Sequence, residues 1–140
     1  MMGAKIEGPL LESMLELARE GHPREVFLLL RGRVRGGCVE LEDFLIPPLA
    51  VSGRGFAEFP IHLLPIDFSI IGTAHSHPSG SPTPSPDDLN NFYGLVMMIL
   101  AYPYSSSNSA VYNRRGERIP LRIIEGEKQT RGRNSGFRGL

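Results

Sequence analysis

Cysteine is nearly absent from this chain of 140 residues, which has only Cys38. One cysteine cannot form a disulfide within the chain, and it cannot supply a zinc site built from several thiolates. Any transition-metal site must therefore draw its ligands from histidine and carboxylate side chains. We interpret Cys38 as a small buried strand residue rather than a nucleophile.

Net charge and long apolar runs are also missing. The formal net charge is +0, so we do not expect nucleic acid to be a partner. The longest apolar run, residues 95–101, is far shorter than the roughly 20 residues that cross a bilayer. The first residues lack the apolar core of a signal peptide. These absences favour a cytoplasmic protein with no membrane partner.

The remaining composition is that of a soluble globular protein, with 41% hydrophobic and 21% charged residues. A chain of this length favours one domain with one core. The composition changes after residue 125, where the segment GEKQTRGRNSGFRGL carries four basic residues and one acidic residue. We therefore expect one domain over residues 1–125 and a disordered basic tail over residues 126–140.

The first half of the chain predicts a helix and two strands. Apolar residues recur at helical spacing over residues 10–18, with Pro9 in the first turn and Gly21 at the stop. The apolar run at residues 26–30 indicates a buried central strand that ends at Gly32. Partial alternation over residues 38–46 predicts a strand with one wet face.

The second half predicts further strands around a proline-rich loop. Residues 68–74 read as a strand that leads into two histidines, and residues 78–86 read as a loop. A helix should begin near Pro86, whereas residues 95–101 fit either a buried strand or a continuation of that helix. A short strand at residues 55–59, and a hairpin formed by residues 109–112 and 119–124, complete the expected elements.

The chemistry concentrates in the segment HSHPSGSPTPSPDD, residues 75–88. Two histidines at i and i+2 on a strand point to the same face, so His75 and His77 can converge on one ion. A helix start can bring Asp88 in as the third ligand. Two imidazoles and one carboxylate leave the fourth tetrahedral position to water, as in catalytic zinc sites. The pattern therefore predicts a Zn²⁺ site.

Two further residues fit a hydrolytic reaction at that site. Zinc lowers the pKa of bound water to roughly 7, and a nearby carboxylate can then take its proton and later deliver it to a leaving amine. Glu25 is the best candidate for this base, because it stands at the mouth of an apolar strand. The Ser85 hydroxyl could donate a hydrogen bond to the tetrahedral oxyanion.

The segment resembles the JAMM (MPN+) family of zinc metallopeptidases. The spacing of His75, His77, Ser85 and Asp88 matches the family motif of His-x-His, seven residues, Ser, two residues and Asp. Glu25 matches the upstream glutamate of the family, since it follows a helix and opens an apolar strand. The order of elements resembles the family over roughly residues 5–125.

This resemblance implies an α/β (α+β mixed) fold of the MPN type, with a mixed sheet flanked by two main helices and zinc at its edge. It also implies hydrolysis after the C-terminal Gly-Gly of ubiquitin or a ubiquitin-like modifier. The chain departs from the family at Leu28, where members often carry glycine, and it lacks a long insertion. Such a minimal core favours a small prokaryotic-type enzyme that acts on ubiquitin-like or sulfur-carrier-like proteins.

Several alternatives stay open at this point. Ser85 and Asp88 also suit the N-cap and third position of a helix, and Asp87 competes with Asp88 as the ligand. We read His22 and His62 as non-ligands. The chain could instead be a non-catalytic MPN-fold binding scaffold that retains its zinc, or it could hold a purely structural zinc. The oligomeric state is open, with a homodimer through a strand edge as one option.

Overall fold

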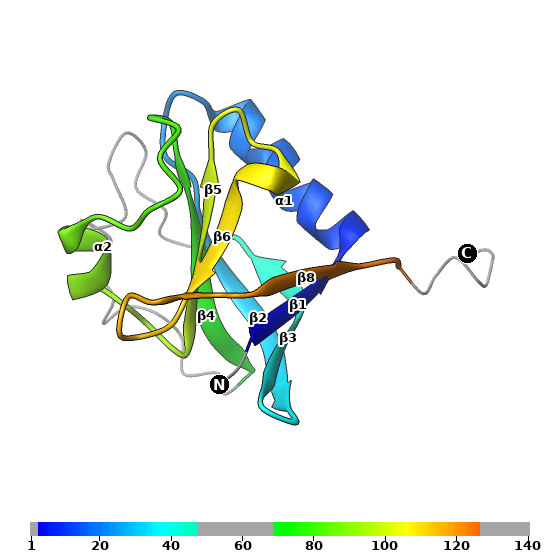
Figure 1. Cartoon of the computed structure of the whole chain (residues 1–140). Coiled ribbons are helices and arrows are strands. Elements are labelled where there is room, and N and C mark those ends of the chain that lie inside the picture. Colours follow the sequence, from blue (N-terminus) through cyan, green and yellow to red (C-terminus); the bar gives the residue numbers. More distant parts are fainter. Residues whose placement is uncertain (1–2, 48–68, 127–140) are drawn as a thin grey trace.

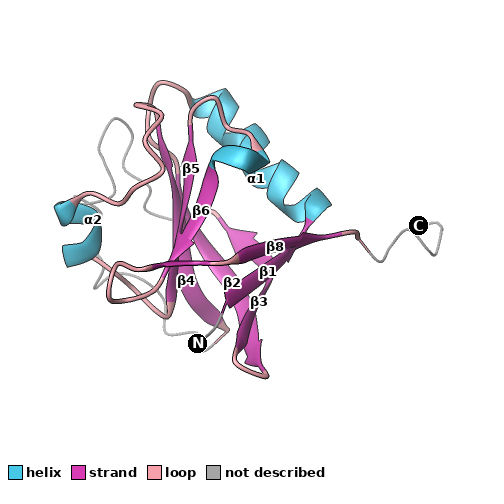
Figure 2. Cartoon of the chain, in the orientation of Figure 1, coloured by secondary structure: helices cyan, strands magenta, loops and turns pink. Residues whose placement is uncertain are grey.

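The computed structural model describes residues 3–47 and 69–126. In these residues, eight strands form one mixed sheet in the order β7-β6-β5-β4-β2-β3-β1-β8 (Figure 2). The strands are β1 (Gly3–Glu7), β2 (Phe27–Arg35), β3 (Cys38–Leu45), β4 (Ile70–His77), β5 (Val96–Ala101), β6 (Ser109–Tyr112), β7 (Arg118–Ile119) and β8 (Leu121–Ile124). The helices are α1 (Gly8–Gly21), α2 (Pro86–Asn90) and the short 3₁₀ helix η3 (Ser106–Asn108).

The long helix α1 covers one face of the sheet, and the short helix α2 lies on the other side (Figure 1). The buried face of α1 is the one that the helical spacing predicts, formed by Leu11, Met14, Leu15 and Ala18. It packs in the main core with alternate residues of the central strands, namely Leu28, Leu30, Ala74, Met98 and Leu100. The hydrophobic effect of burying these side chains holds α1 against the sheet.

The opposite face of the sheet carries a second, smaller cluster, formed by Ile99, Ala101, Ala110 and Tyr112. The parallel register pairs His75 with Ile99 and His77 with Ala101. Because successive side chains of a strand alternate between faces, both histidines belong to the face of this cluster, away from α1.

The predicted helix and three of the predicted strands are present. The strand expected at residues 38–46 is β3, and the strand leading into the histidines is β4, which includes both of them. Residues 95–101, which also fitted a continuing helix, form strand β5 parallel to β4. Helix α2 ends at Asn90, well before β5. The α/β class and the mixed sheet are confirmed, although α2 is a helix of only five residues.

The expected end of the central strand at Gly32 was wrong, because β2 continues to Arg35. The register between β2 and β3 shifts between Arg31 and Gly32, which marks an irregularity of the bulge type. A Cβ atom at Gly32 would lie 2.0 Å from the Glu40 carbonyl oxygen. Glycine therefore permits the close approach of the two strands at this point rather than ending one of them.

The expected hairpin at residues 109–112 and 119–124 was only partly right. Strand β6 pairs antiparallel with the short β7, but after Pro120 the chain reaches the other edge of the sheet. There β8 pairs in parallel with β1, a strand that the sequence reading missed. Ala4 and Ile6 of β1 are buried, which is a period-two signal too short to stand out.

Some expectations fall outside the described residues. These are the short strand at residues 55–59, the position of His62, and the basic tail from residue 127 onward. Within the residues that are described, no helix has the length and apolar character needed to span a bilayer.

Candidate metal centre

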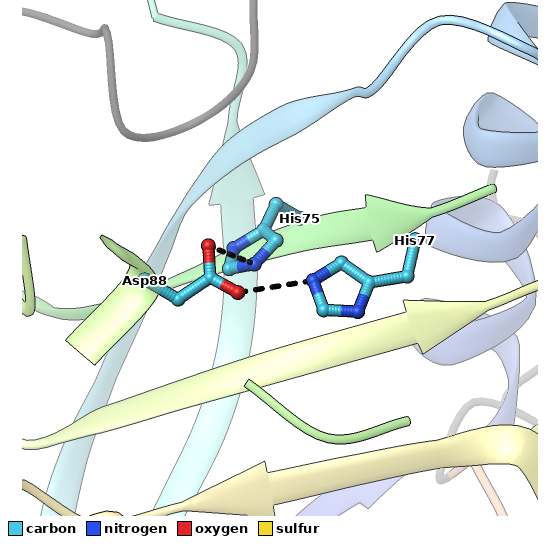
Figure 3. Close-up of side chains that lie close together, drawn as sticks. All are labelled: His75, His77 and Asp88. Carbon is cyan, nitrogen blue, oxygen red and sulfur yellow. Dashed lines mark hydrogen bonds and ion pairs between the residues drawn. The ribbon is translucent and has the colours of Figure 1, made fainter. Parts of the chain in front are cut away.

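His75, His77 and Asp88 converge on the face of the sheet opposite α1 (Figure 3). The carboxylate of Asp88 lies between the two imidazoles: Oδ1 is 3.3 Å from Nε2 of His75, and Oδ2 is 3.1 Å from Nε2 of His77. Bond lengths of about 2.0–2.2 Å place neighbouring ligand atoms of a tetrahedral zinc site about 3.3 Å apart. Each histidine thus lies near this separation from one carboxylate oxygen, and ligand atoms of all three side chains lie within 4.8 Å of one another, which places them within reach of one zinc ion.

The hydrogen bonding of His77 also fits a metal. Its Nδ1 lies 2.8 Å from the Ser81 carbonyl oxygen, which can only accept, so Nδ1 carries the proton. In the neutral ring, Nε2 then presents a lone pair toward Asp88 Oδ2 at 3.1 Å. Two acceptors at this distance repel each other unless a proton or a cation lies between them. A proton or a cation between His77 and Asp88 would therefore stabilise this arrangement.

The pKa values of His77 and Asp88 are shifted in the directions that favour positive charge between them. Burial lowers the pKa of His77, but hydrogen bonds with Asp88 and Ser81 and the negative charges of Asp88 and Glu25 outweigh burial and raise it. Burial raises the pKa of Asp88, but the two imidazoles and the backbone N–H of Ser85 hold it well below its usual range. These contacts therefore favour the ionised form of Asp88, which is the form that can bind a metal.

Helix α2 delivers Asp88 to the site through its first turn. The backbone N–H of Asp88 donates to Ser85 Oγ (3.0 Å), and the backbone N–H of Ser85 donates to Asp88 Oδ2 (2.8 Å). This is a capping box with Pro86 at the first helical position. The capping role and the position facing the histidines coexist, since the carboxylate has two oxygens. Asp87 is exposed and does not join the group.

Strand β4 delivers the two histidines from the centre of the sheet, between β2 and β5. His75 is fully buried, and His77 is more accessible at the end of the strand. Among the described residues, this group of metal-binding side chains includes no fourth His, Cys, Asp or Glu. A set of three ligands is typical of catalytic zinc sites, whereas structural sites close the fourth position with protein.

Glu25 lies at the mouth of the site, directly before β2. Phe27 stands opposite His75 in the antiparallel register of β2 and β4. The pairing extends one residue further, because Ser76 N donates to Val26 O at 3.0 Å. By the same register, Glu25 lies opposite His77 and shares its face of the sheet. The side chain is exposed, so it can reach a substrate at the metal.

The structure separates other predicted residues from the site. His22 is exposed and contacts Tyr102 and Tyr104 instead of the metal group. Cys38 is half-buried in β3. Leu28 packs in the main core, on the face away from the histidines, so the departure from glycine there does not touch the site. The sequence reading missed the Ser81 carbonyl, because backbone acceptors leave no trace in residue spacing.

Comparisons with known proteins agree with this geometry. Residues 7–115 match the family model described as prokaryotic homologs of the JAB domain. A protein of Haloferax volcanii named "Probable metalloprotease" is 37% identical over 125 residues, which covers 84% of this chain and 77% of that protein.

Solved structures show the same fold. One, described as JAMM, a metalloprotease-like zinc site in the proteasome and signalosome, has a TM-score of 0.64 and 31% identity and covers 87% of this chain and 98% of its own. A JAB1/MPN domain protein from Archaeoglobus fulgidus has a TM-score of 0.62 and 34% identity. The match covers 86% of this chain and 99% of that protein. A protein from Desulfitobacterium hafniense at 20% identity, with a TM-score of 0.64 and coverage of 93% and 99%, supports the fold alone.

The family match spans most of the chain, and His75, His77 and Asp88 form the donor set that such a zinc site needs. The chain therefore belongs to the prokaryotic JAB-domain family and is a zinc metalloprotease of the JAMM type.

Proposed function

We propose that this chain hydrolyses the peptide or isopeptide bond that follows the C-terminal Gly-Gly of a ubiquitin-like or sulfur-carrier-like small modifier protein. In this proposal His75, His77 and Asp88 are the zinc ligands, Glu25 is the general base and Ser85 is the oxyanion donor. The observation that carries it is the convergence of the three ligand side chains on the face that Glu25 shares with His77.

When bound, a zinc ion with three protein ligands supplies Lewis-acid chemistry, which makes water nucleophilic near neutral pH. The Glu25 carboxylate accepts the proton of the attacking water and later gives it to the leaving amine. Its exposed position beside His77 suits this task, because the proton must travel from the site to a substrate group that arrives from solvent.

Ser85 can serve the helix and the reaction at once. Its Oγ accepts the backbone N–H of Asp88, and this leaves the hydroxyl hydrogen for another acceptor. An exposed hydroxyl next to the metal ligand Asp88 is placed to donate to a developing oxyanion. A donor of this kind contributes about 10²–10³ in kcat when its geometry is good.

The substrate class rests on the resemblance of residues 75–88 and Glu25 to the JAMM motif. A ubiquitin-like protein or its conjugates is the proposed partner. A cytoplasmic location, where the lone thiol of Cys38 stays reduced, is part of the same proposal.

The test measures zinc content together with cleavage of modifier fusions that end in Gly-Gly joined to a reporter amine. We expect one zinc per chain in the wild type and in Glu25→Gln, with cleavage only in the wild type. Removal of zinc by a chelator should abolish cleavage, and added zinc should restore it. Turnover that survives in both His75→Ala and Glu25→Gln would refute the assignment of the site.

The alternative is a non-catalytic MPN-fold scaffold with a retained zinc site. It predicts zinc in both proteins, cleavage in neither, and a stable complex with an unprocessed modifier. The approach of Glu25 to the histidine face argues against it, since a scaffold needs no base at that position.

A further inference from the structure

The loop between β4 and α2 carries three consecutive backbone carbonyls, those of residues 80–82, here called the carbonyl segment. Side chains from a distant part of the chain hold its two outer carbonyls. Asn108 Nδ2 donates to the Gly80 oxygen at 3.2 Å, and Tyr112 Oη donates to the Pro82 oxygen at 2.6 Å. The two donors come from η3 and β6, which are consecutive elements, so the same part of the fold holds both outer carbonyls of the loop.

The middle carbonyl of the segment is the one that holds the metal-site histidine. Ser81 O accepts the Nδ1 hydrogen of His77 at 2.8 Å. Because a peptide plane moves with its neighbours, fixing the carbonyls on either side restricts the direction of the Ser81 carbonyl. A neutral imidazole can carry its proton on either nitrogen, and the acceptor at Nδ1 decides which one. The direction of this carbonyl thus determines whether Nε2 presents a lone pair to a metal.

The anchor at Tyr112 is well built for this task. Its ring is 5% exposed and packs with Ile99, Ala101 and Ala110, on the same face as the histidines. The phenol therefore spans from the sheet to the loop without freedom to swing away. Asn108 is held as well, since its Nδ2 also donates to the Tyr102 carbonyl at 2.8 Å. Inside the loop the segment is supported by short turns, in which Gly80 N donates to His77 O at 3.1 Å and Ser81 N donates to Ser79 Oγ at 3.2 Å.

From these contacts we infer that Tyr112 and Asn108 are positioning residues of the metal centre. Through the carbonyl segment they hold the His77 ring with Nδ1–H toward the Ser81 carbonyl and Nε2 toward Asp88. This inference rests on the proposed function in one respect, the assignment of His77 as a zinc ligand. Partners that orient a ligating histidine contribute about 10–100-fold to metal affinity. Tyr112 acts one residue further away, so we expect its hydroxyl to contribute about tenfold.

The decisive variant is Tyr112→Phe, which keeps the packed ring and removes only the hydroxyl. Two quantities are measured: the zinc Kd, by competition with a chelating dye, and the chemical shifts of the His77 Nδ1–H group in metal-free protein, at a pH where both ring nitrogens carry a proton. We expect the Kd to rise about tenfold. The Nδ1–H signals should move toward those of an imidazole that has lost its hydrogen bond to the Ser81 carbonyl.

Tyr93→Phe is the matched control, because the Tyr93 hydroxyl makes no hydrogen bond within the described part of the chain. It should leave both measurements at wild-type values. Asn108→Ala should shift the His77 signals in the same direction as Tyr112→Phe, since it releases the other end of the segment.

The inference is overturned if Tyr112→Phe keeps the wild-type Nδ1–H shifts of His77. This holds even if its zinc affinity or melting temperature falls, because a merely structural role would lower those without changing the Nδ1–H signal. A failure of the proposed function looks different. Wild-type protein would then bind no zinc or cleave no fusion, whereas the comparison of the His77 signals in metal-free protein would still be informative.

Discussion

His22 and Tyr104 are joined by a hydrogen bond of 2.6 Å between Nδ1 and the phenol oxygen. The bond connects the loop after α1 to the loop after β5. The His22 ring also stacks on Tyr102, with 4.9 Å between ring centroids. Arg19 Nη2 donates to the Tyr104 carbonyl at 2.8 Å, so both the backbone and the side chain of Tyr104 are fixed. Glu25 follows three residues after His22, so this contact helps to hold the chain that leads to the proposed base.

Replacing Tyr104 by Phe should therefore loosen the segment that carries Glu25. We expect kcat to fall several-fold while zinc content stays unchanged, and the free energy of unfolding to fall by about 1 kcal/mol. Tyr102→Phe is the control, since it keeps the stacked ring on His22. Steady-state kinetics, metal analysis and denaturant unfolding check the outcome. An unaltered kcat in a destabilised Tyr104→Phe protein would mean that the anchor serves folding only.

Asp88→Asn should remove zinc, whereas Asp87→Asn should not. Both residues lie in the first turn of α2, but only Asp88 faces the histidines. The side-chain amide that replaces the Asp88 carboxylate can still accept the Ser85 N–H, but it is a weaker metal ligand. We expect the zinc Kd to rise by more than about 100-fold, the upper end of the loss caused by changing a partner of a ligand. Equal zinc binding by the two variants would contradict this.

Ser85→Ala should show two separable losses. Loss of the N-cap oxygen should lower the free energy of unfolding by about 1 kcal/mol. Loss of an oxyanion donor should lower kcat by about 10²–10³. Ser85→Gly is the control, because glycine at an N-cap lowers stability by only about a few tenths of a kcal/mol but has no hydroxyl to donate. If Ser85→Gly keeps both stability and full turnover, the hydroxyl has no role in the reaction.

The metal-free and zinc-bound proteins should respond to pH in opposite ways. The raised pKa of His77 stabilises the metal-free protein below the unfolded pKa of about 6.5, and this contribution is lost as pH rises through the folded pKa. Zinc, in contrast, must displace that proton, so its affinity grows as pH rises. As pH rises from about 6 to about 9, the melting temperature measured in chelator should fall by the amount that this contribution supplied. Over the same range, the rise in melting temperature on adding zinc should become larger. Parallel trends would show that His77 does not take the proton.

Gly94→Ala should destabilise the fold far more than Gly36→Ala. Both glycines have positive φ angles, 83° and 60°. A Cβ at Gly94 would lie 2.5 Å from the Ile71 carbonyl oxygen, whereas nothing lies within 4 Å of a Cβ at Gly36. We expect losses of about 2–5 kcal/mol at Gly94 and about 1–2 kcal/mol at Gly36. Denaturant unfolding of both variants is the measurement.

Much of the candidate site could be predicted from the sequence because its key spacings are local. The strand period brings His75 and His77 to one face, and the Ser-Pro-Asp-Asp helix start brings Asp88 to meet them. Glu25 could be selected from its place before an apolar strand and from the resemblance, but its approach to His77 depends on how β2 and β4 pair. The anchors at Asn108 and Tyr112 could not be predicted, because they reach backbone carbonyls nearly thirty residues away or more.

The fold divides in the same way. Helix α1 and strand β3 follow from periodicity, which is a property of neighbouring residues. The division of residues 118–124 into two strands does not follow from periodicity. It depends on the break at Pro120 and on the pairing of β8 with β1. Gly32 was misinterpreted as a strand end for the same reason, because its role depends on a distant neighbour. A glycine that ends a strand and a glycine that admits a neighbouring carbonyl look identical until the neighbour is known.

The parallel pairing of β1 with β8 has a kinetic meaning. Ala4 pairs with Leu121, so the two strands join residues separated by almost the whole described chain. Contacts of such high sequence separation slow folding, because the closure entropy of the intervening loop must be overcome before they stabilise anything. During synthesis, the outer side of β1 stays unpaired until residues 121–124 have left the ribosome. The nascent chain therefore exposes a strand edge, open to pairing with other chains, for nearly the whole of its translation.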